Sequence, residues 1–270
     1  MEKEDKVVNS NEALSILRQL ETGKDLSEIL VDVNLSDFVK DNTKIWKVRL
    51  NKIIEGNPKV KEALIYIIKN YTKKRKNNPD KFGRMHCVEA ASLIAEHWFC
   101  NPNEVSAALL HDVWEDIPNW EEYLRNTYNE DTVNMVWYLT ERDKTWDSLE
   151  AKKASRKERK LEEMEKISSF MPEVLALKLG DLISNIAETV DDLEKLSPEE
   201  RQIYREWFNA GYDKQIWKYS TLNDIIESRI QACKDEQLFQ NEEEEKNLEL
   251  FVNKYKFLVE KMDSLMSVMP

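Results

Sequence analysis

The chain has 270 residues, of which 34 % are charged, and it contains only 5 Gly and 7 Pro. Its formal net charge of −12 argues against a nucleic-acid polymer as partner, because phosphate contacts need clustered Lys and Arg. No apolar run approaches the ~18 residues that a membrane span requires, and nothing resembles a targeting signal. The three cysteines lack C-x-x-C spacing, which excludes a zinc ribbon or a disulfide framework. We therefore expect a cytoplasmic protein with no membrane partner.

Few segments alternate apolar and polar residues over strand lengths, and this pattern predicts an all-α protein with short turns. We expect an N-terminal helical extension over residues 1–50, a helical bundle over 51–195 and C-terminal helices over 196–270. The C-terminal helices would pack on the bundle or extend it. The terminal helices are also the candidates for contacts in a homo-oligomer.

Hydrophobic periodicity predicts the individual helices. In chain order they cover 51–76, 84–99, 102–116, 119–127, 130–140, 148–169, 173–192, a helix from 198, 212–235 and 244–266. The helix from 102 has a clear start, because Asn101 can cap it, Pro102 takes its first position and Glu104 its third. Ser197-Pro198-Glu199-Glu200 opens the helix from 198 in the same style.

Four titratable residues close the helix expected over 102–116: His111, Asp112, Glu115 and Asp116. On a helix that turns ~100° per residue, they share one arc with Ala108 and Val105, which lie one to two turns earlier. Burying three carboxylates and an imidazole together is costly unless a cation compensates them. This pattern favours a metal site, and the alternative is an exposed polar helix end that happens to contain a histidine.

Two further residues are candidate ligands. His86 lies near the start of the preceding helix, and the short connection predicts antiparallel neighbours, so His86 would approach His111 and Asp112. Asp181 interrupts a strongly apolar helix, with Asn185 on the same face one turn later. A buried aspartate needs a partner, and a metal would supply one.

Two imidazole nitrogens and two carboxylate oxygens form a mixed, fairly hard ligand set. It favours one Mn²⁺ ion, with Fe²⁺, Mg²⁺ or Zn²⁺ as the other candidates. Such a site leaves positions for water and for a phosphate oxygen. Glu115 and Asp116, if they are not ligands, are placed to take the proton of that water.

Basic side chains precede the first ligand. Four positive charges lie within ten residues just before His86: Arg75, Lys76, Lys81 and Arg84. If they face the metal, they can hold substrate phosphates away from the reacting centre, and Lys178 can add to the same field. The alternative is a solvated loop that aids solubility.

The pattern H…HD…D resembles the HD superfamily of metal-dependent phosphohydrolases. The segment from about 71 to 193 resembles, more narrowly, the hydrolase domain of the RelA/SpoT alarmone family and its small stand-alone hydrolases. Four matches carry this resemblance: the L-L-H-D-x-x-E-D of Leu109–Asp116, the V-x-x-L-T of Val136–Thr140, the K-L-x-D-x-x-x-N of Lys178–Asn185, and the basic pair Arg75-Lys76.

The resemblance implies a role for each matching residue. His86, His111, Asp112 and Asp181 would be the metal ligands of an HD hydrolase domain over 51–195. Glu115 and Asp116 would activate the water. Arg75 and Lys76 would contact the guanine nucleotide, and Asn185 would hold it. The implied activity is removal of the 3′-pyrophosphate from a guanosine polyphosphate such as ppGpp.

The chain departs from the family in three places. Residues 80–85 replace a tyrosine-rich, proline-bearing segment that usually precedes the first ligand histidine, and two single positions differ beside the motifs. Leu182 stands where an arginine usually follows the last metal aspartate, and Ile117 stands where a threonine usually follows the E-D pair. Two alternatives therefore stay open. The protein is an HD phosphohydrolase that acts on another nucleotide or phosphoester, or it is a non-enzymatic nucleotide-binding or scaffold protein.

Overall fold

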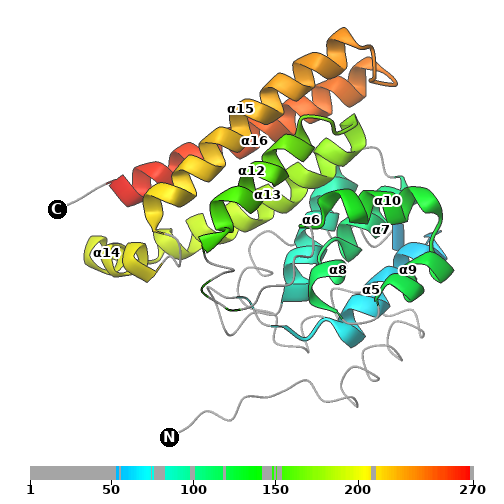
Figure 1. Ribbon diagram of the computed structural model, residues 1–270, viewed down its shortest axis with the longest axis horizontal. Helices are drawn as coiled ribbons and strands as arrows, with labels where there is room; N and C mark the ends of the chain where they lie inside the picture. Colours follow the sequence, from blue (N-terminus) through cyan, green and yellow to red (C-terminus); the bar gives the residue numbers. More distant parts are fainter. Residues whose placement is uncertain are drawn as a thin grey trace, which may run out of the picture. The chain divides into compact units, whose positions relative to one another are not determined.

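The computed structural model describes residues 53–54, 56–73, 75, 83–97, 101–117, 120–141, 148, 150, 154–207 and 211–267. Every regular element within these residues is a helix, which confirms the predicted all-α class (Figure 1). The expected N-terminal extension over 1–50 lies outside the described residues. None of the described helices is long and apolar enough to cross a membrane.

The contacts within the chain divide it into two compact units. Of the described residues, the first unit holds those up to 96 and from 101 to 136, and the second holds His97 and those from 137 onward. The helices are α5 (Pro58–Asn70), α6 (Gly83–His97), α7 (Pro102–Leu110), α8 (Val113–Asp116), α9 (Trp120–Thr127), α10 (Glu130–Leu139), α12 (Arg156–Ile167), α13 (Pro172–Glu194), α14 (Pro198–Trp207), α15 (Tyr212–Asp235) and α16 (Glu242–Ser267). The expected boundary at residue 195 stays a prediction.

Helix α7 is a core helix of the first unit. All of its residues from Glu104 to Leu110 are buried, and it packs against α5. The side chain of Asn101 accepts a hydrogen bond from the amide of Asn103, and Pro102 is the first helical residue, which confirms the predicted start. A buried helix of this kind fixes the position of whatever follows its last turn.

Helix α5 is shorter than the sequence pattern predicted. The continuous helix expected over 51–76 is wrong, because the backbone at Asn57 is extended and α5 begins at Pro58 and ends at Asn70. The physical reason is that proline disfavours the helical conformation of the residue before it. The Asn57 side chain then caps the amides of Lys59 and Val60.

Aromatic contacts hold α9 against α5. The rings of Tyr66 and Tyr123 stack with their centroids 3.7 Å apart. Farther along, the hydroxyl of Tyr128 donates to the carbonyl of Lys59 at 3.3 Å. Helix α9, held in this way, also contacts α8.

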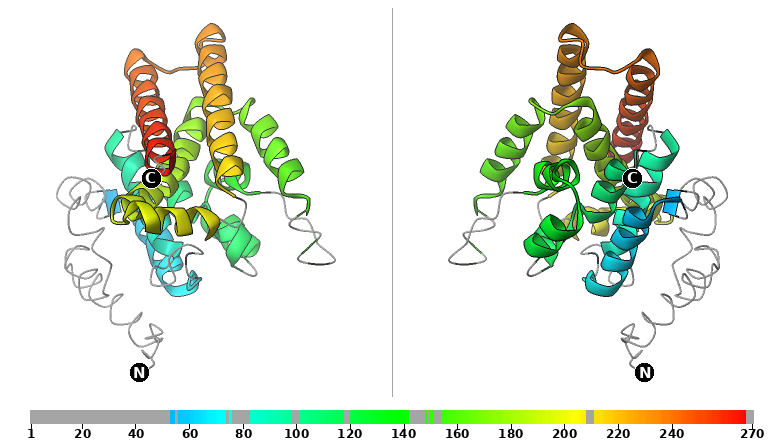
Figure 2. Two further views of the ribbon diagram at one scale, coloured as in Figure 1. Left: turned by 90° about the vertical axis from the view of Figure 1, so that its left-hand side faces the viewer. Right: turned by 90° about the vertical axis from the view of Figure 1, so that its right-hand side faces the viewer.

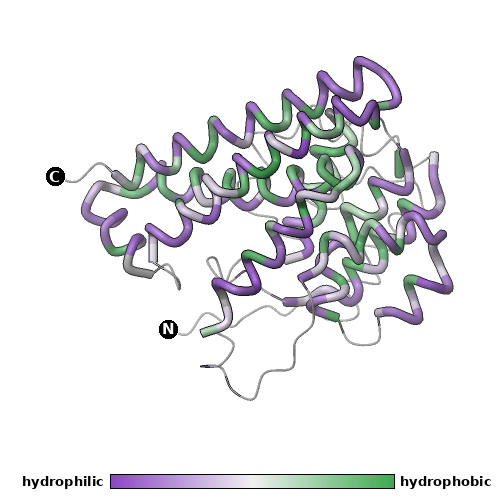
Figure 3. Tube along the Cα trace, turned by 45° about the horizontal axis from the view of Figure 1, so that its top comes forward, coloured by the Kyte–Doolittle hydropathy of each residue, from purple (hydrophilic) through white to green (hydrophobic). Residues whose placement is uncertain are grey.

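The second unit is built around α13, most of whose residues are buried. Helix α16 packs along α13, and α15 packs on both α16 and α12. Helices α15 and α16 run antiparallel and are joined by a short connection (Figure 2). Apolar and polar residues alternate along both helices, as expected for helices with one buried side (Figure 3).

Specific hydrogen bonds fix the helices of the second unit. The buried hydroxyl of Tyr255 on α16 donates to the carbonyl of Tyr219 on α15 at 2.9 Å. Ser197 and Glu200 form the reciprocal capping box predicted for α14, with hydrogen bonds of 2.8 and 3.3 Å. Helix α13, which packs along α16, carries Asp181.

Candidate metal centre

Two buried imidazoles face one another in the first unit. His86 on α6 and His111 after α7 are 3 % and 5 % exposed. Their Nε2 atoms are 3.1 Å apart, and the rings meet edge to face at 77°. The predicted approach of His86 to His111 is thus present in the structure.

The backbone turns at His111 and Asp112. The single helix expected over 102–116 is wrong, because α7 ends at Leu110 and α8 begins at Val113. The cause is local: the carbonyl of Ala108 accepts a hydrogen bond from His111 Nδ1 at 2.8 Å, and Asp112 has a ψ of −6°. The predicted common arc of four titratable residues is replaced by a tight turn between two helices.

The turn still places Asp112 beside the histidines. Its Oδ1 lies 3.3 Å from His111 Nε2, and one ligand atom from each of His86, His111 and Asp112 lies within 4.8 Å of the others. When His111 Nδ1 carries the proton that it donates to Ala108, Nε2 keeps its lone pair. The orientation of the ring is therefore set by the carbonyl behind it.

The three groups fit a metal ion. Ligand bonds of about 2.1 Å at tetrahedral or octahedral angles separate neighbouring ligand atoms by about 3.0–3.4 Å. The separations of 3.1 Å and 3.3 Å match that spacing. Two imidazole nitrogens and a carboxylate oxygen also form a donor set that divalent transition metals accept.

Asp116 is held by two residues that the sequence pattern did not single out. The Tyr71 hydroxyl donates to Asp116 Oδ2 at 2.7 Å and also contacts Asp112 Oδ2 at 3.1 Å. Lys73 forms a close ion pair with Asp116 Oδ1. Burial raises the pKa of the Tyr71 hydroxyl far above its ordinary value, and the nearby carboxylate of Asp112 raises it further, so this hydroxyl stays protonated and acts as a donor.

The other predicted residues of the first unit have different environments. Glu115 on α8 is exposed and Arg75 is half-buried, whereas Lys76 and Lys81 lie outside the described residues. Arg84 is buried, and its guanidinium makes long contacts of 3.4 and 3.5 Å to the carbonyls of Ile68 and Tyr71. Arg84 thus reaches the end of α5, and its predicted contact with substrate stays a prediction.

In the second unit, Asp181 is half-buried on α13 and both of its carboxylate oxygens are engaged. Lys178 Nζ lies 2.9 Å from Oδ2, and Asn185 Nδ2 lies 2.6 Å from Oδ1. Lys178 also pairs with Glu163 Oε1 at 2.7 Å. The sequence assigned Lys178 and Asn185 to the substrate, and in this structure both hold Asp181.

Charges alternate around Lys178. Burial works against its charge, but Asp181 and Glu163 hold the pKa of the ammonium well above its ordinary value. Burial likewise works against the Glu163 carboxylate, yet Lys178 and Lys160 keep the pKa of that carboxyl well below its usual range. Burial and the neighbouring Lys160 lower the pKa of Lys218, on α15, to about 8. The charges near Asp181 therefore come from three helices: α12, α13 and α15.

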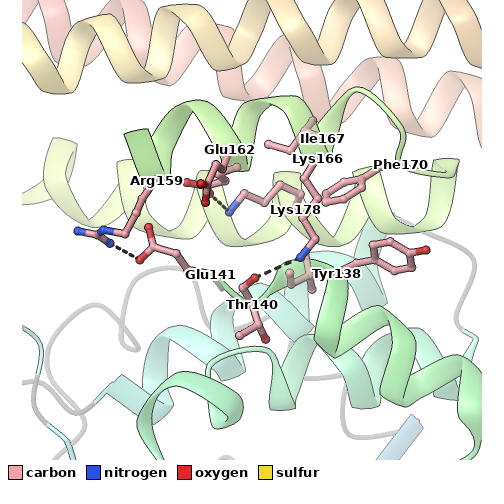
Figure 4. Close-up of a pocket in the computed structure, with 11 residues that line it drawn as sticks. Tyr138, Thr140, Glu141, Arg159, Glu162, Lys166, Ile167, Phe170 and Lys178 are labelled. Carbon is pink, nitrogen blue, oxygen red and sulfur yellow. Dashed lines mark hydrogen bonds and ion pairs between the residues drawn. The ribbon is translucent and has the colours of Figure 1, made fainter. Parts of the chain in front are cut away.

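A pocket opens beside this charge network (Figure 4). Its walls are formed by Tyr138, Leu139, Thr140, Glu141, Arg159, Glu162, Glu163, Lys166, Ile167, Phe170 and Lys178. Arg159 pairs with Glu141 at 2.6 Å, and Lys166 donates to the carbonyl of Thr140 at 3.2 Å. The pocket lies next to the Lys178 that holds Asp181.

Comparisons with known proteins match the part of the chain that contains these residues. A sequence model described as an HD domain matches residues 63–209, more than half of the chain. No curated protein matches the sequence. A solved structure described as a metazoan ortholog of SpoT that hydrolyzes ppGpp and plays a role in starvation responses is similar over 73 % of this chain and 95 % of its own, with 20 % identity and a TM-score of 0.49. The family match includes all four predicted ligands and ends before α15.

Asp112→Ala is expected to weaken binding of Mn²⁺ by about 100-fold or more, because loss of even an outer partner typically costs 10- to 100-fold. The rise in melting temperature that Mn²⁺ gives the wild type should disappear as well. Electron paramagnetic resonance of free Mn²⁺ measures the affinity. Asp131→Ala, at an exposed position of α10, is the matched control. Wild-type affinity in Asp112→Ala would remove this residue from the ligand set.

Proposed function

We propose that this chain, which belongs to the HD domain family of metal-dependent phosphohydrolases, removes the 3′-pyrophosphate from a guanosine polyphosphate such as ppGpp in the cytoplasm. The observation that carries the proposal is the meeting of His86, His111 and Asp112 at ligand spacing, followed at once by Glu115 and Asp116. A scaffold has no need of two buried imidazole nitrogens and a carboxylate at ligand spacing, whereas a metal-dependent hydrolase requires such a set.

Asp181 is the fourth ligand in this proposal. It lies within the span matched by the HD family, and an ammonium and an amide hold its two oxygens on the buried helix α13. Hydrogen bonds to a ligating carboxylate are usual, because they orient it toward the ion. Lys178 and Asn185 therefore support the centre by holding Asp181.

A bound divalent ion, with Mn²⁺ preferred, would lower the pKa of a coordinated water and polarise the phosphorus. The chain's own residues supply the other functions. Glu115 is exposed on α8, directly after the turn, and accepts the water's proton. Asp116, whose two oxygens are engaged by Tyr71 and Lys73, stays fixed beside it. The two acidic residues thus take different roles.

The basic residues divide in the same way. Arg75 and Lys76 contact the phosphates or the base of the nucleotide, since a guanidinium binds phosphate oxygens in pairs and stacks on bases. Arg84, Lys178 and Asn185 act one step further away, because they hold the carbonyl of Tyr71 and the carboxylate of Asp181. Substrate affinity should therefore depend most on the first pair.

One observation favours a second candidate, a phosphohydrolase for another nucleotide or phosphoester. Leu182, which stands where the resembled family has arginine, is only 1 % exposed. It packs in the core of the second unit, so no guanidinium follows Asp181 to contact a phosphate. A substrate with fewer phosphates would need no such group.

A panel of nucleotides tests the proposal. Purified protein with Mn²⁺ is incubated with ppGpp, GTP, GDP, a 3′-nucleotide monophosphate and a generic phosphodiester, and released phosphate and pyrophosphate are measured separately. Release of pyrophosphate from ppGpp, and from no other compound of the panel, supports the proposed activity. Turnover of another compound supports the second candidate. Metal binding without turnover of any compound would support the non-enzymatic reading.

Asp181→Ala is expected to weaken Mn²⁺ binding by about 10-fold or more, because it removes a proposed ligand. It should also remove the thermal stabilisation that Mn²⁺ confers, since binding energy is also folding energy. Asp213→Ala on α15, where the side chain is 92 % exposed, is the control. Unchanged metal affinity in Asp181→Ala would leave a three-ligand site confined to the first unit.

Glu115→Gln should keep the metal and lose most turnover, because the amide keeps the shape of the side chain without its basicity. General bases typically contribute on the order of 10²–10⁴-fold. The measurement is kcat at saturating Mn²⁺, with Glu122→Gln on the exposed side of α9 as control. A rate within about threefold of wild type, well short of that range, would assign the proton to another group.

Arg75→Ala combined with Lys76→Ala should raise KM for ppGpp by roughly tenfold, which corresponds to ~1.4 kcal/mol for one lost charge-assisted contact. Hydrolysis of a small phosphodiester, which cannot reach the pair, should change little. Lys69→Ala, exposed at the end of α5, controls for the loss of surface charge. Equal losses on both substrates would mean that the pair supports the fold.

A further inference from the structure

Tyr71 makes an unusual pair of contacts for a buried tyrosine. It follows the last residue of α5 and is 3 % exposed. Its hydroxyl oxygen is 2.7 Å from Asp116 Oδ2 and 3.1 Å from Asp112 Oδ2. By contrast, the buried hydroxyls of Tyr128 and Tyr255 donate to backbone carbonyls. Only the hydroxyl of Tyr71, among these three, is spent on carboxylates.

The contact divides the two oxygens of Asp112. Oδ1 is turned toward His111 Nε2, at 3.3 Å, and Oδ2 is turned toward Tyr71. An outer-shell donor on the non-ligating oxygen is the usual way in which proteins aim a carboxylate at a metal. The hydroxyl of Tyr71 thus sits where it sets the rotation of Asp112 about its side-chain bond.

The hydroxyl has one proton and two carboxylates within reach. With both carboxylates charged, it can satisfy only one of them at a time. When Asp112 Oδ2 accepts the proton, Oδ1 remains turned toward His111, and Lys73 still holds Asp116. One hydroxyl therefore serves both acidic side chains.

Gly83 leaves room for the Tyr71 ring. A Cβ atom at position 83 would lie 2.7 Å from both Cζ and Oη of Tyr71, closer than side chains tolerate. The amide of Gly83 also donates to the carbonyl of Lys73 at 2.8 Å. Gly83 begins α6, three residues before His86. The segment that presents His86 is thus shaped to hold Tyr71 as well.

We propose that Tyr71 is a positioning residue of this centre, which aims Asp112 at the metal and ties it to Asp116, and that Gly83 is required to seat it. The inference rests on the proposed metal site. It does not depend on which phosphorylated compound is hydrolysed, because the orientation of Asp112 is set before any substrate binds.

Tyr71→Phe tests the proposal, since it keeps the ring against Gly83 and removes only the hydroxyl. Mn²⁺ affinity, measured by electron paramagnetic resonance, should fall about 10-fold, the lower end for loss of an outer-shell partner. At saturating Mn²⁺, kcat should fall while KM for the hydrolysed compound stays within about twofold, because the ring makes no substrate contact in this proposal. Tyr128→Phe, which removes a buried hydroxyl from the same unit, should change neither quantity.

Gly83→Ala provides the second variant, because it keeps the hydroxyl and displaces the ring. Its Mn²⁺ affinity should fall in the same direction. If both changes act through one hydroxyl, the double variant should bind Mn²⁺ no more weakly than the single variant that has the lower Mn²⁺ affinity. Circular dichroism and melting temperature of the metal-free proteins show whether each variant remains folded.

The outcomes separate the two proposals. Metal binding by wild type without hydrolysis of any nucleotide would overturn the proposed function, and Tyr71→Phe would still be tested by affinity. Wild-type Mn²⁺ affinity and kcat in Tyr71→Phe would overturn the role of Tyr71 and leave the metal site standing. Equal losses in Tyr71→Phe and Tyr128→Phe would also overturn it, because they would mean that any buried hydroxyl stabilises the unit to the same effect.

Discussion

The candidate metal centre depends on one approach: His86 Nε2 and His111 Nε2 lie 3.1 Å apart in a buried position. Two lone pairs at that distance repel, so one nitrogen must carry a proton or a cation must lie between them. The hydrogen bond from His111 Nδ1 to Ala108 already uses one proton of that ring. The buried helix α7 and the turn after it keep the rings in place, and the rest of the first unit keeps α7 in place.

Two of the predicted acidic residues have charged or hydrogen-bonding partners within their own unit. Asp116 has Tyr71 and Lys73, and in the second unit Asp181 has Lys178 and Asn185. Such partners lower the cost of keeping anionic ligands charged and half-buried before a metal arrives. At Asp181, the proposed fourth ligand, Lys178 would compete with the ion for Oδ2. The balance suits a centre that binds a divalent ion and still leaves acidic groups oriented for chemistry.

The sequence predicted the parts of the site whose chemistry stands out against its surroundings. His111 follows the apolar run Ala107–Leu110, and a polar group in such a run needs a partner, which the structure supplies as His86. Asp181 interrupts an apolar helix in the same way, and its place among the ligands stays a prediction. Tyr71 could not be found this way, because an aromatic residue after an apolar helix reads as core, and only its distances to two carboxylates reveal its role. The break at His111-Asp112 was also out of reach, since a side chain competing for one carbonyl decides it and the hydrophobic period does not register it.

Helices α15 and α16, which follow the family match, help to hold the helix that carries Asp181. Helix α16 packs along α13, and α15 is linked to α16 by the hydrogen bond from Tyr255 to the carbonyl of Tyr219. Beside Tyr219, Lys218 shares an electrostatic environment with Lys160, Lys178, Glu163 and Asp181, and its pKa of about 8 records burial among like charges. A protonated lysine there adds positive potential around Asp181. The C-terminal helices therefore bear on the charge around the proposed fourth ligand as well as on the packing of α13.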